Sequence, residues 1–169
     1  RDTDFSWREF VERNNSELLG AYGNLINRTL AFITKYLGRV IPGGTPEDAI
    51  AAQIDALYPA VGEKIENGQF KDALERIFEL VRFGNKYFDA DEPWKTRNND
   101  AQKCGQTLFN CVQIIANLSV FLAPFLPFSS EKVSDWLGLS PVWQPQWVPA
   151  GYALPAVTIL FERLDKKVI

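Results

Sequence analysis

Apolar side chains recur at every third or fourth position in long stretches of this chain, and that spacing is typical of helices. One such run lies between residues 70 and 81, and another lies between residues 108 and 122. Residues with this period share one face of an α-helix, which must then be buried against another element. The runs are Phe70, Ala73, Leu74, Ile77, Phe78 and Val81, and Leu108, Cys111, Val112, Ile115, Leu118 and Leu122, and they predict an all-α fold.

The first predicted helix begins at a capping box. Ser6 caps the helix and Glu9 follows three residues later, the pairing that satisfies the first free N–H groups. The helical pattern continues to about Leu37. A bend is expected near Gly20 and Gly23, and Gly38 is the expected C-terminal cap.

A second helix is predicted after the loop that ends at Gly44. Thr45 is its expected cap, and Pro46 suits the first helical position because that position needs no N–H donor. Pro59 and Gly62 are expected to bend or split this helix, and Asn67 and Gly68 to end it.

Prolines and capping residues divide the second half. The helix that begins near Phe70 is expected to stop before Pro93, and residues 89–99 are predicted to be a connector. Asp100 begins the next helix. Pro124 and Pro127 end it, and a short helix is expected to run from Ser129 to Gly138.

These boundaries predict an up-and-down bundle of about five helices over residues 1–138. Residues 139–169 are rich in proline and tryptophan and are predicted to form an irregular tail packed on the bundle. Residues 158–161 have the composition of a short strand, without an evident partner strand.

Composition limits the classes of function. The chain has 169 residues, enough for one domain with a sizeable core, and a net charge of −3. Nucleic-acid-binding proteins usually carry a basic excess, so any RNA contact here must rely on a local patch or on base stacking. There is no uninterrupted apolar run of membrane-spanning length and no secretory signal at the start, which favours a cytoplasmic protein without a membrane partner.

The reactive residue types exclude several kinds of chemistry. The chain has no histidine, so Ser-His-Asp and Cys-His catalysis are excluded. Cys104 and Cys111 are too far apart along a helix for a disulfide and are expected to be reduced core thiols. No metal-ligand spacing or phosphate-binding glycine loop is present, so we expect no catalytic residue, metal, cofactor or small-molecule substrate. The lack of methionine, including an initiator, indicates a piece of a longer protein.

Pro93 and Trp94 form the first candidate binding element. Pro93 stops the preceding helix and restricts Glu92 to an extended conformation, so Trp94 would be held in place on a short connector. Lys95 and Arg97 follow it. A fixed indole beside cationic side chains is suited to stacking on a nucleic-acid base, whereas the structural alternative is packing in a groove between helices.

Asn24 and Arg28 form the second candidate element. They lie one helical turn apart and share a polar face with Lys35, opposite the apolar face of the same helix. An amide offers both a donor and an acceptor, and a guanidinium offers a planar fork of donors, so both residues suit recognition of a single base. The alternative is an ordinary solvated helix face.

Four segments, in this order and at these distances, resemble the anticodon-binding helical domain of the methionyl-tRNA synthetase family, which belongs to the class I synthetases. They are residues 10–18, residues 22–30, residues 84–87 with Pro93 and Trp94, and residues 115–118 leading into residues 124–129. The resemblance extends to about Leu139.

The resemblance implies a role in reading the CAU anticodon of methionine tRNA. Asn24 and Arg28 match the family's hydrogen-bonding pair, and Pro93 and Trp94 match its proline and stacking tryptophan. The family's ATP, methionine and zinc sites belong to a catalytic domain, which would be the second partner of this chain. Without that domain the chain is expected to be inactive as an enzyme.

Two alternatives remain open on the sequence. One is the corresponding bundle of a class I synthetase for leucine, isoleucine, valine or cysteine. The other is a helical protein-interaction module without RNA binding, which would present an exposed apolar patch.

Overall fold

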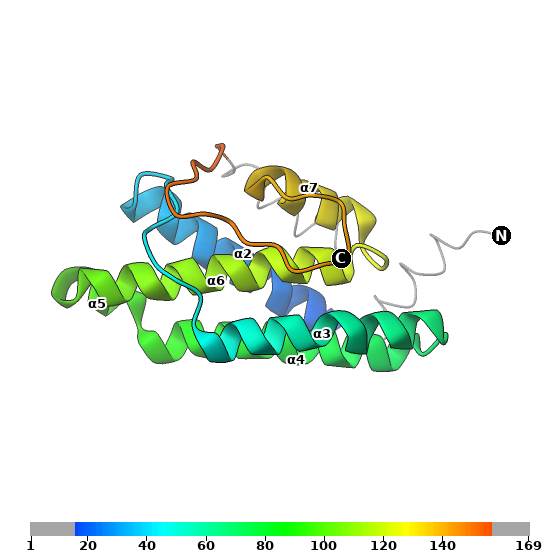
Figure 1. Ribbon diagram of the computed structural model, residues 1–169. Coiled ribbons are helices and arrows are strands. Elements are labelled where there is room, and N and C mark those ends of the chain that lie inside the picture. The colour runs from blue at the N-terminus through cyan, green and yellow to red at the C-terminus, as the bar shows by residue number, and fades with distance from the viewer. Residues whose placement is uncertain (1–15, 157–169) are drawn as a thin grey trace.

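The computed structural model describes residues 16–156, and these residues form a helical bundle (Figure 1). The prediction of an all-α bundle is confirmed: there are five long helices and one short helix, α5, in the described part. The helices are α2 (Ser16–Tyr36), α3 (Asp48–Glu66), α4 (Phe70–Asp91), α5 (Pro93–Asn99), α6 (Ala101–Leu122) and α7 (Pro127–Leu137).

Helix α6 forms the centre of the bundle and packs against each of the other five helices. From Thr107 to Ser119 all of its residues are buried, the pattern of a helix surrounded by other elements. Among the described helices, only α6 is long and apolar enough to cross a membrane by length and composition, and most of that stretch is buried inside the protein. Its apolar character is therefore accounted for by its central position.

Helix α2 is continuous through Gly20 and Gly23, so the predicted bend is not seen as a break. The predicted C-terminal cap is confirmed: Gly38 has φ 65°, and the N–H of Arg39 donates to the carbonyl of Ile33 at 3.1 Å. The predicted start at Ser6 and Glu9 and the predicted strand at residues 158–161 lie outside the described residues.

Helix α3 differs from its prediction at its start and at its middle. It begins at Asp48 with Glu47 as N-cap, instead of beginning after a Thr45 cap, because the backbone N–H of Thr45 is bonded to Gln106 of α6. Pro59 lies inside the unbroken helix. Pro59 and Asp55 are both exposed, so water can reach the carbonyl group that the missing N–H leaves free.

Gly62 is a packing position and not a helix break. A Cβ at Gly62 would lie 3.1 Å from Nε1 of Trp143, whose N–H donates to the carbonyl of Tyr58 at 3.0 Å. Helix α3 ends at Asn67 and Gly68 as predicted.

Residues 89–99 are not a connector, and this prediction is wrong. Helix α4 continues to Asp91, one residue separates the helices, and α5 begins at Pro93. That residue, Glu92, has the left-handed conformation, with φ 48° and ψ 61°, instead of the predicted extended one. Right-handed helical geometry is disfavoured before proline, and the left-handed region is a second way to avoid it.

Helix α6 is capped by the side chain of Asp100 and ends before Pro124, as predicted. Helix α7 begins at Pro127 instead of at Ser129, since proline is well suited to the first helical position. Gly138, with φ 66°, ends it.

Residues 139–156 contain no helix or strand of regular length in the described part of the chain, but they are tied to the bundle by buried amides of α6. The side chain of Gln113 accepts from the N–H of Val148 at 2.8 Å and donates to its carbonyl at 2.9 Å. Asn117 makes the same pair of bonds with Gln146, both at 2.9 Å. The amide side chains thus satisfy backbone groups that an irregular segment cannot pair internally.

Candidate nucleic-acid interface

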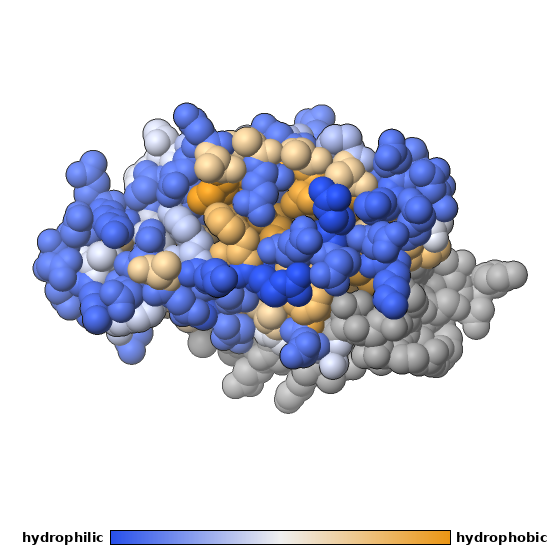
Figure 2. Space-filling view, turned by 90° about the horizontal axis from the view of Figure 1, so that it is seen from below, coloured by the Kyte–Doolittle hydropathy of each residue, from blue (hydrophilic) through white to orange (hydrophobic). Residues whose placement is uncertain are grey.

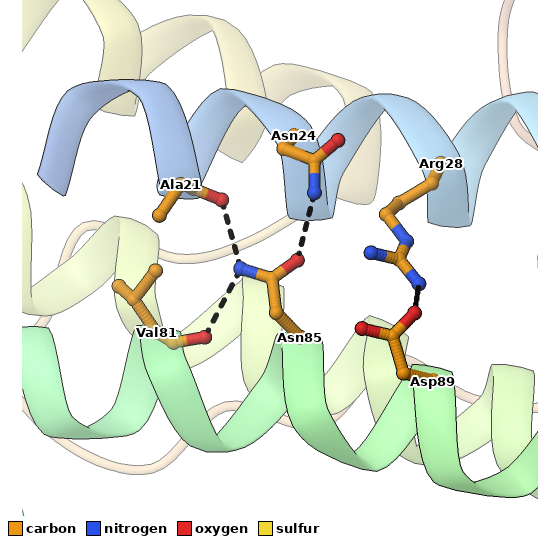
Figure 3. Close-up of polar contacts among 6 residues, drawn as sticks. All are labelled: Ala21, Asn24, Arg28, Val81, Asn85 and Asp89. Carbon is orange, nitrogen blue, oxygen red and sulfur yellow. Dashed lines mark hydrogen bonds and ion pairs between the residues drawn. The ribbon is translucent and has the colours of Figure 1, made fainter. Parts of the chain in front are cut away.

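Asn24 and Arg28 lie along the contact between α2 and α4 (Figure 3). Nδ2 of Asn24 donates to Oδ1 of Asn85 at 3.2 Å, and Arg28 forms an ion pair with Asp89. Both pairs join residues 61 positions apart, so the two helices run parallel here. The polar residues, four positions apart on each helix, therefore lie opposite each other in pairs. The predicted polar face is therefore anchored to a second helix.

Asn85 fixes this register from the α4 side. Its Nδ2 donates to the carbonyl of Ala21 at 3.0 Å and to that of Val81 at 3.3 Å, which turns its Oδ1 toward Asn24. Close packing supports the same arrangement: a Cβ added at Gly84 would lie 2.8 Å from Cδ2 of Leu25. A side chain at position 84 would therefore force Leu25 to shift, and glycine avoids this.

Arg28 and Trp94 are brought together by one aromatic ring, that of Phe88. The guanidinium carbon of Arg28 lies 4.1 Å from the centre of the Phe88 ring, and the Trp94 ring centre lies 6.2 Å from it at an angle of 34°. Phe88 itself is buried, whereas Trp94 is 45% exposed. Residues from α2 and α5 therefore converge on one surface, with a ring of α4 between them.

Hydrogen bonds in the first turn of α5 fix the backbone position of Trp94. The carbonyl of Glu92 accepts from the N–H groups of Lys95 at 2.8 Å and Thr96 at 3.1 Å, so the residue that ends α4 also begins α5. Pro93 is buried, and its carbonyl accepts a long hydrogen bond, 3.6 Å, from the thiol of Cys104. Trp94 thus projects from a fixed helical turn, a firmer support than the predicted connector.

The two cysteines are free and buried behind this surface, as predicted. Burial raises the pKa of Cys111 to about 12 and also raises the pKa of Cys104. Both thiols therefore remain protonated at neutral pH and act as packing groups.

The polar groups of this surface remain available for a ligand. Arg28 has a side-chain exposure of 23%, and a guanidinium has five N–H groups, of which Asp89 engages only some. Asn24 is exposed, and its Oδ1 is turned away from Asn85. The site therefore offers one acceptor, several donors and an aromatic face within a small area.

Sequence reasoning missed the α4 residues that support this site. It placed Asp89, Asp91 and Glu92 in a connector and gave them no role, whereas each of them has a partner. Asp89 pairs with Arg28, Glu92 with Lys95 at 3.3 Å, and Asp91 accepts from Thr107 at 2.8 Å. The available signal was the four-residue spacing of Asn85 and Asp89, which equals that of Asn24 and Arg28.

A pocket of about 500 Å³ lies between the ends of α3, α4 and α6, and Asp91 is one of its lining residues. At its wall, the hydroxyl of Tyr87 donates to Glu47 at 2.8 Å and accepts from Asn110 at 3.1 Å. Burial is the main reason that the pKa of Tyr87 is raised. Within residues 16–156, no group of three His, Cys, Asp or Glu side chains is placed to hold a metal ion.

Known proteins resemble this chain in sequence and in fold. Residues 41–166 match the family described as the anticodon binding domain of methionyl tRNA ligase, and residues 1–30 match the class I tRNA synthetases of the methionine type. A Methionine--tRNA ligase of Bacillus cereus (strain B4264) is 53% identical over 171 aligned positions, and one of Bacillus mycoides (strain KBAB4) is 52% identical over 170. Each alignment covers 100% of this chain and 31% of the relative.

Solved structures agree with the sequence comparison. The free form of the Mycobacterium tuberculosis methionyl-tRNA synthetase superposes with a TM-score of 0.75 at 28% identity, covering 86% of this chain and 32% of that one. The same enzyme with methionyl-adenylate gives a TM-score of 0.76 at the same identity, with 86% and 31% covered. The fold is thus that of a helical domain of class I aminoacyl-tRNA synthetases.

Within that class, the chain belongs to the family of anticodon-binding domains of methionyl-tRNA ligases. It spans about a third of the length of the relatives that it matches.

Proposed function

We propose that this chain recognises the CAU anticodon of methionine tRNA as part of a cytoplasmic methionyl-tRNA ligase. The observation that carries the proposal is the shared contact with Phe88: the guanidinium of Arg28 and the exposed indole of Trp94 both lie against its ring. Asn24 lies one turn from Arg28 on the same helix.

The three side chains have complementary roles in this proposal. The Trp94 indole stacks on the first anticodon base, an interaction worth about 1–3 kcal/mol for each base. Asn24 and Arg28 hydrogen-bond to base edges. A wrong base leaves these polar groups without partners, and that cost provides the discrimination.

Asp89 and Phe88 position Arg28 before RNA arrives. The ion pair with Asp89 and the contact with the Phe88 ring hold the guanidinium in one orientation, so less side-chain freedom is lost on binding. Local recognition of this kind needs no basic surface over the whole molecule, which is consistent with the net charge of −3.

The second proposed partner is the catalytic part of the same ligase. We propose that ATP, methionine and any zinc ion are bound there, and that the helical bundle holds the anticodon at a fixed distance from that site. Pro93 contributes by setting the direction of α5 and therefore of Trp94.

Trp94→Ala in the full-length ligase tests the stacking role. We expect kcat/KM for charging methionine tRNA to fall about 5- to 150-fold, the equivalent of about 1–3 kcal/mol, because the base loses its stacking partner. Steady-state charging assays measure this change.

Two controls separate stacking from damage to the fold. Trp94→Phe keeps an aromatic face and should retain most of the activity. Methionine-dependent ATP–pyrophosphate exchange, which requires no tRNA, should be unchanged in both variants. Normal charging by a folded Trp94→Ala enzyme would refute the stacking role.

A further inference from the structure

A second group of aromatic and cationic side chains lies beside the Trp94 surface, at the end of the molecule where α5 meets the carboxyl end of α2 (Figure 1). Its centre is Tyr36, which is 40% exposed. The guanidinium carbon of Arg97 lies 4.0 Å from the Tyr36 ring centre, and Nζ of Lys35 lies 5.3 Å from it. We call Lys35, Tyr36 and Arg97 the Tyr36 cluster.

Aromatic rings connect the Tyr36 cluster to the proposed base-binding surface without a gap. Phe32 contacts Tyr36, with ring centres 4.9 Å apart, and contacts Phe88 with ring centres 6.5 Å apart. Phe88 in turn contacts both Arg28 and Trp94. Phe32 and Phe88 are buried, so these rings join the cluster to the proposed anticodon site beneath the surface and hold the two as neighbours.

The cations of the cluster differ from the other cations of this surface in having no carboxylate partner. Arg28 is paired with Asp89, and Lys95 is paired with Glu92. Arg97 and Lys35, in contrast, form no ion pair among the described residues, and each lies over the Tyr36 ring. In a chain with net charge −3, two cations that contact one exposed ring and have no carboxylate partner mark a site for an anion.

The ring contacts hold the charges in place without neutralising them. A cation over an exposed aromatic ring is attracted strongly enough to restrict a long side chain but less strongly than by a charge-assisted hydrogen bond. Lys35, Tyr36 and Arg97 are all exposed, so the cluster faces solvent. The end of the molecule where α5 lies is covered mainly by hydrophilic residues in the view of Figure 2.

We propose that the Tyr36 cluster binds phosphate groups of the RNA backbone next to the anticodon, with Arg97 and Lys35 as the phosphate-contacting residues. This inference rests on the proposed function, because it takes the RNA at Trp94 as its starting point. It adds a sequence-independent contact to the base contacts of Asn24, Arg28 and Trp94, since phosphate contacts set the position of RNA and carry no sequence information directly.

Arg97→Gln in the full-length ligase tests the proposal by equilibrium binding of methionine tRNA over a range of salt concentrations. We expect about a threefold to tenfold loss of affinity at low salt. We also expect the slope of log affinity against log salt to become shallower by about 0.7–0.9 for each lost phosphate contact. Lys35→Gln should act in the same direction, and the double variant should lose more slope than either one alone.

Two variants serve as controls. Lys71→Gln removes an exposed cation from the first turn of α4, far along that helix from α5, and should leave affinity and salt slope unchanged. Arg97→Lys keeps the charge and should retain most of the slope. If Arg97 served only to join α5 to α2 through Tyr36, Arg97→Gln and Arg97→Lys would weaken binding alike with the wild-type slope, and the proposal would be wrong.

The anticodon dependence distinguishes this proposal from the proposed function itself. Arg97→Gln should weaken binding of methionine tRNA and of an anticodon-altered tRNA by the same factor, whereas Arg28→Gln should reduce the difference between them. An effect of Trp94→Ala with an unchanged slope for Arg97→Gln would overturn the phosphate site alone. No effect of Trp94→Ala would overturn the proposed function.

Discussion

Tyr22 and Tyr58 are buried in the same core, but their hydroxyl groups have different surroundings. The hydroxyl of Tyr58 donates to Oδ1 of Asn117 at 2.6 Å. The hydroxyl of Tyr22 is fully buried and has no hydrogen-bond partner in the described part of the protein. An unpaired buried hydroxyl costs about 1–3 kcal/mol, so Tyr22 carries a penalty that Tyr58 does not.

We predict that Tyr22→Phe increases the free energy of unfolding by about 1 kcal/mol, because it removes the unpaired oxygen and keeps the ring. Tyr58→Phe is the matched control and should decrease it by about the same amount, since the side-chain oxygen of Asn117 loses one of its donors. Urea denaturation followed by circular dichroism measures both. Destabilisation by Tyr22→Phe would show that its hydroxyl is satisfied.

At the scale of single residues, the sequence was sufficient to predict which side chains form the candidate site. It was not sufficient to predict which residues hold them in place. The pairing of Asn24 with Arg28 and the position of Trp94 follow from spacing and from one proline. The buried ring of Phe88, which joins them, belongs to a helix that sequence spacing alone cannot place beside both. Contacts between residues 61 positions apart depend on tertiary packing.

At the scale of elements, glycine controls how closely α2 approaches α4. Gly84 faces Leu25 and Ile114, and a Cβ there would lie 2.8 Å and 3.3 Å from their methyl carbons. Gly20 of α2 is exposed, and a Cβ there would meet no atom of another segment within 4 Å in the described part of the chain. Glycine is therefore required for close packing at position 84, whereas at position 20 it only reduces helix stability.

We predict that Gly84→Ala lowers the free energy of unfolding by about 1–3 kcal/mol through overpacking, despite the better helix propensity of alanine. It should also weaken tRNA binding, because moving the helices apart weakens the contacts of Asn24 with Asn85 and of Arg28 with Asp89. Gly20→Ala should be neutral or stabilising by up to about 1 kcal/mol. Thermal unfolding and tRNA binding of both variants test this prediction, and equal effects of the two would contradict it.

Helix boundaries were predictable where a local signal had no competitor. Gly38, Asp100 and Gly138 act as caps because their own conformations or side chains decide the outcome. The start of α3 and the geometry of Glu92 were not predictable, since hydrogen bonds with α6 and the join between α4 and α5 decide them.

For the molecule as a whole, several buried acids hold their protons more tightly in the folded state than in the unfolded chain. Burial raises the pKa of Cys111 to about 12 and raises the pKa values of Tyr22, Tyr58 and Tyr87. A raised folded-state pKa contributes stability that is complete below the unfolded pKa and is lost as pH rises through the folded pKa.

We therefore predict that the free energy of unfolding begins to fall above about pH 9, where thiols of the unfolded chain ionise, and falls more steeply above about pH 10, where its tyrosines ionise. Each group contributes at most about 1.4 kcal/mol per pH unit. Urea midpoints measured in reducing buffer from about pH 8 to about pH 11 test this. Cys111→Ala should flatten the first part of the fall, and a flat profile for the wild type would contradict the prediction.

The two polar pairs between the parallel helices α2 and α4 have a consequence for protein engineering. These pairs depend on the relative alignment of two helical segments and on the small residue at Gly84. They join Asn24 to Asn85 and Arg28 to Asp89. The long stretch of chain between them, including all of α3, supplies none of these four side chains. The arrangement is therefore modular: a designed scaffold with two parallel helices at this separation can receive the four side chains as a transplant.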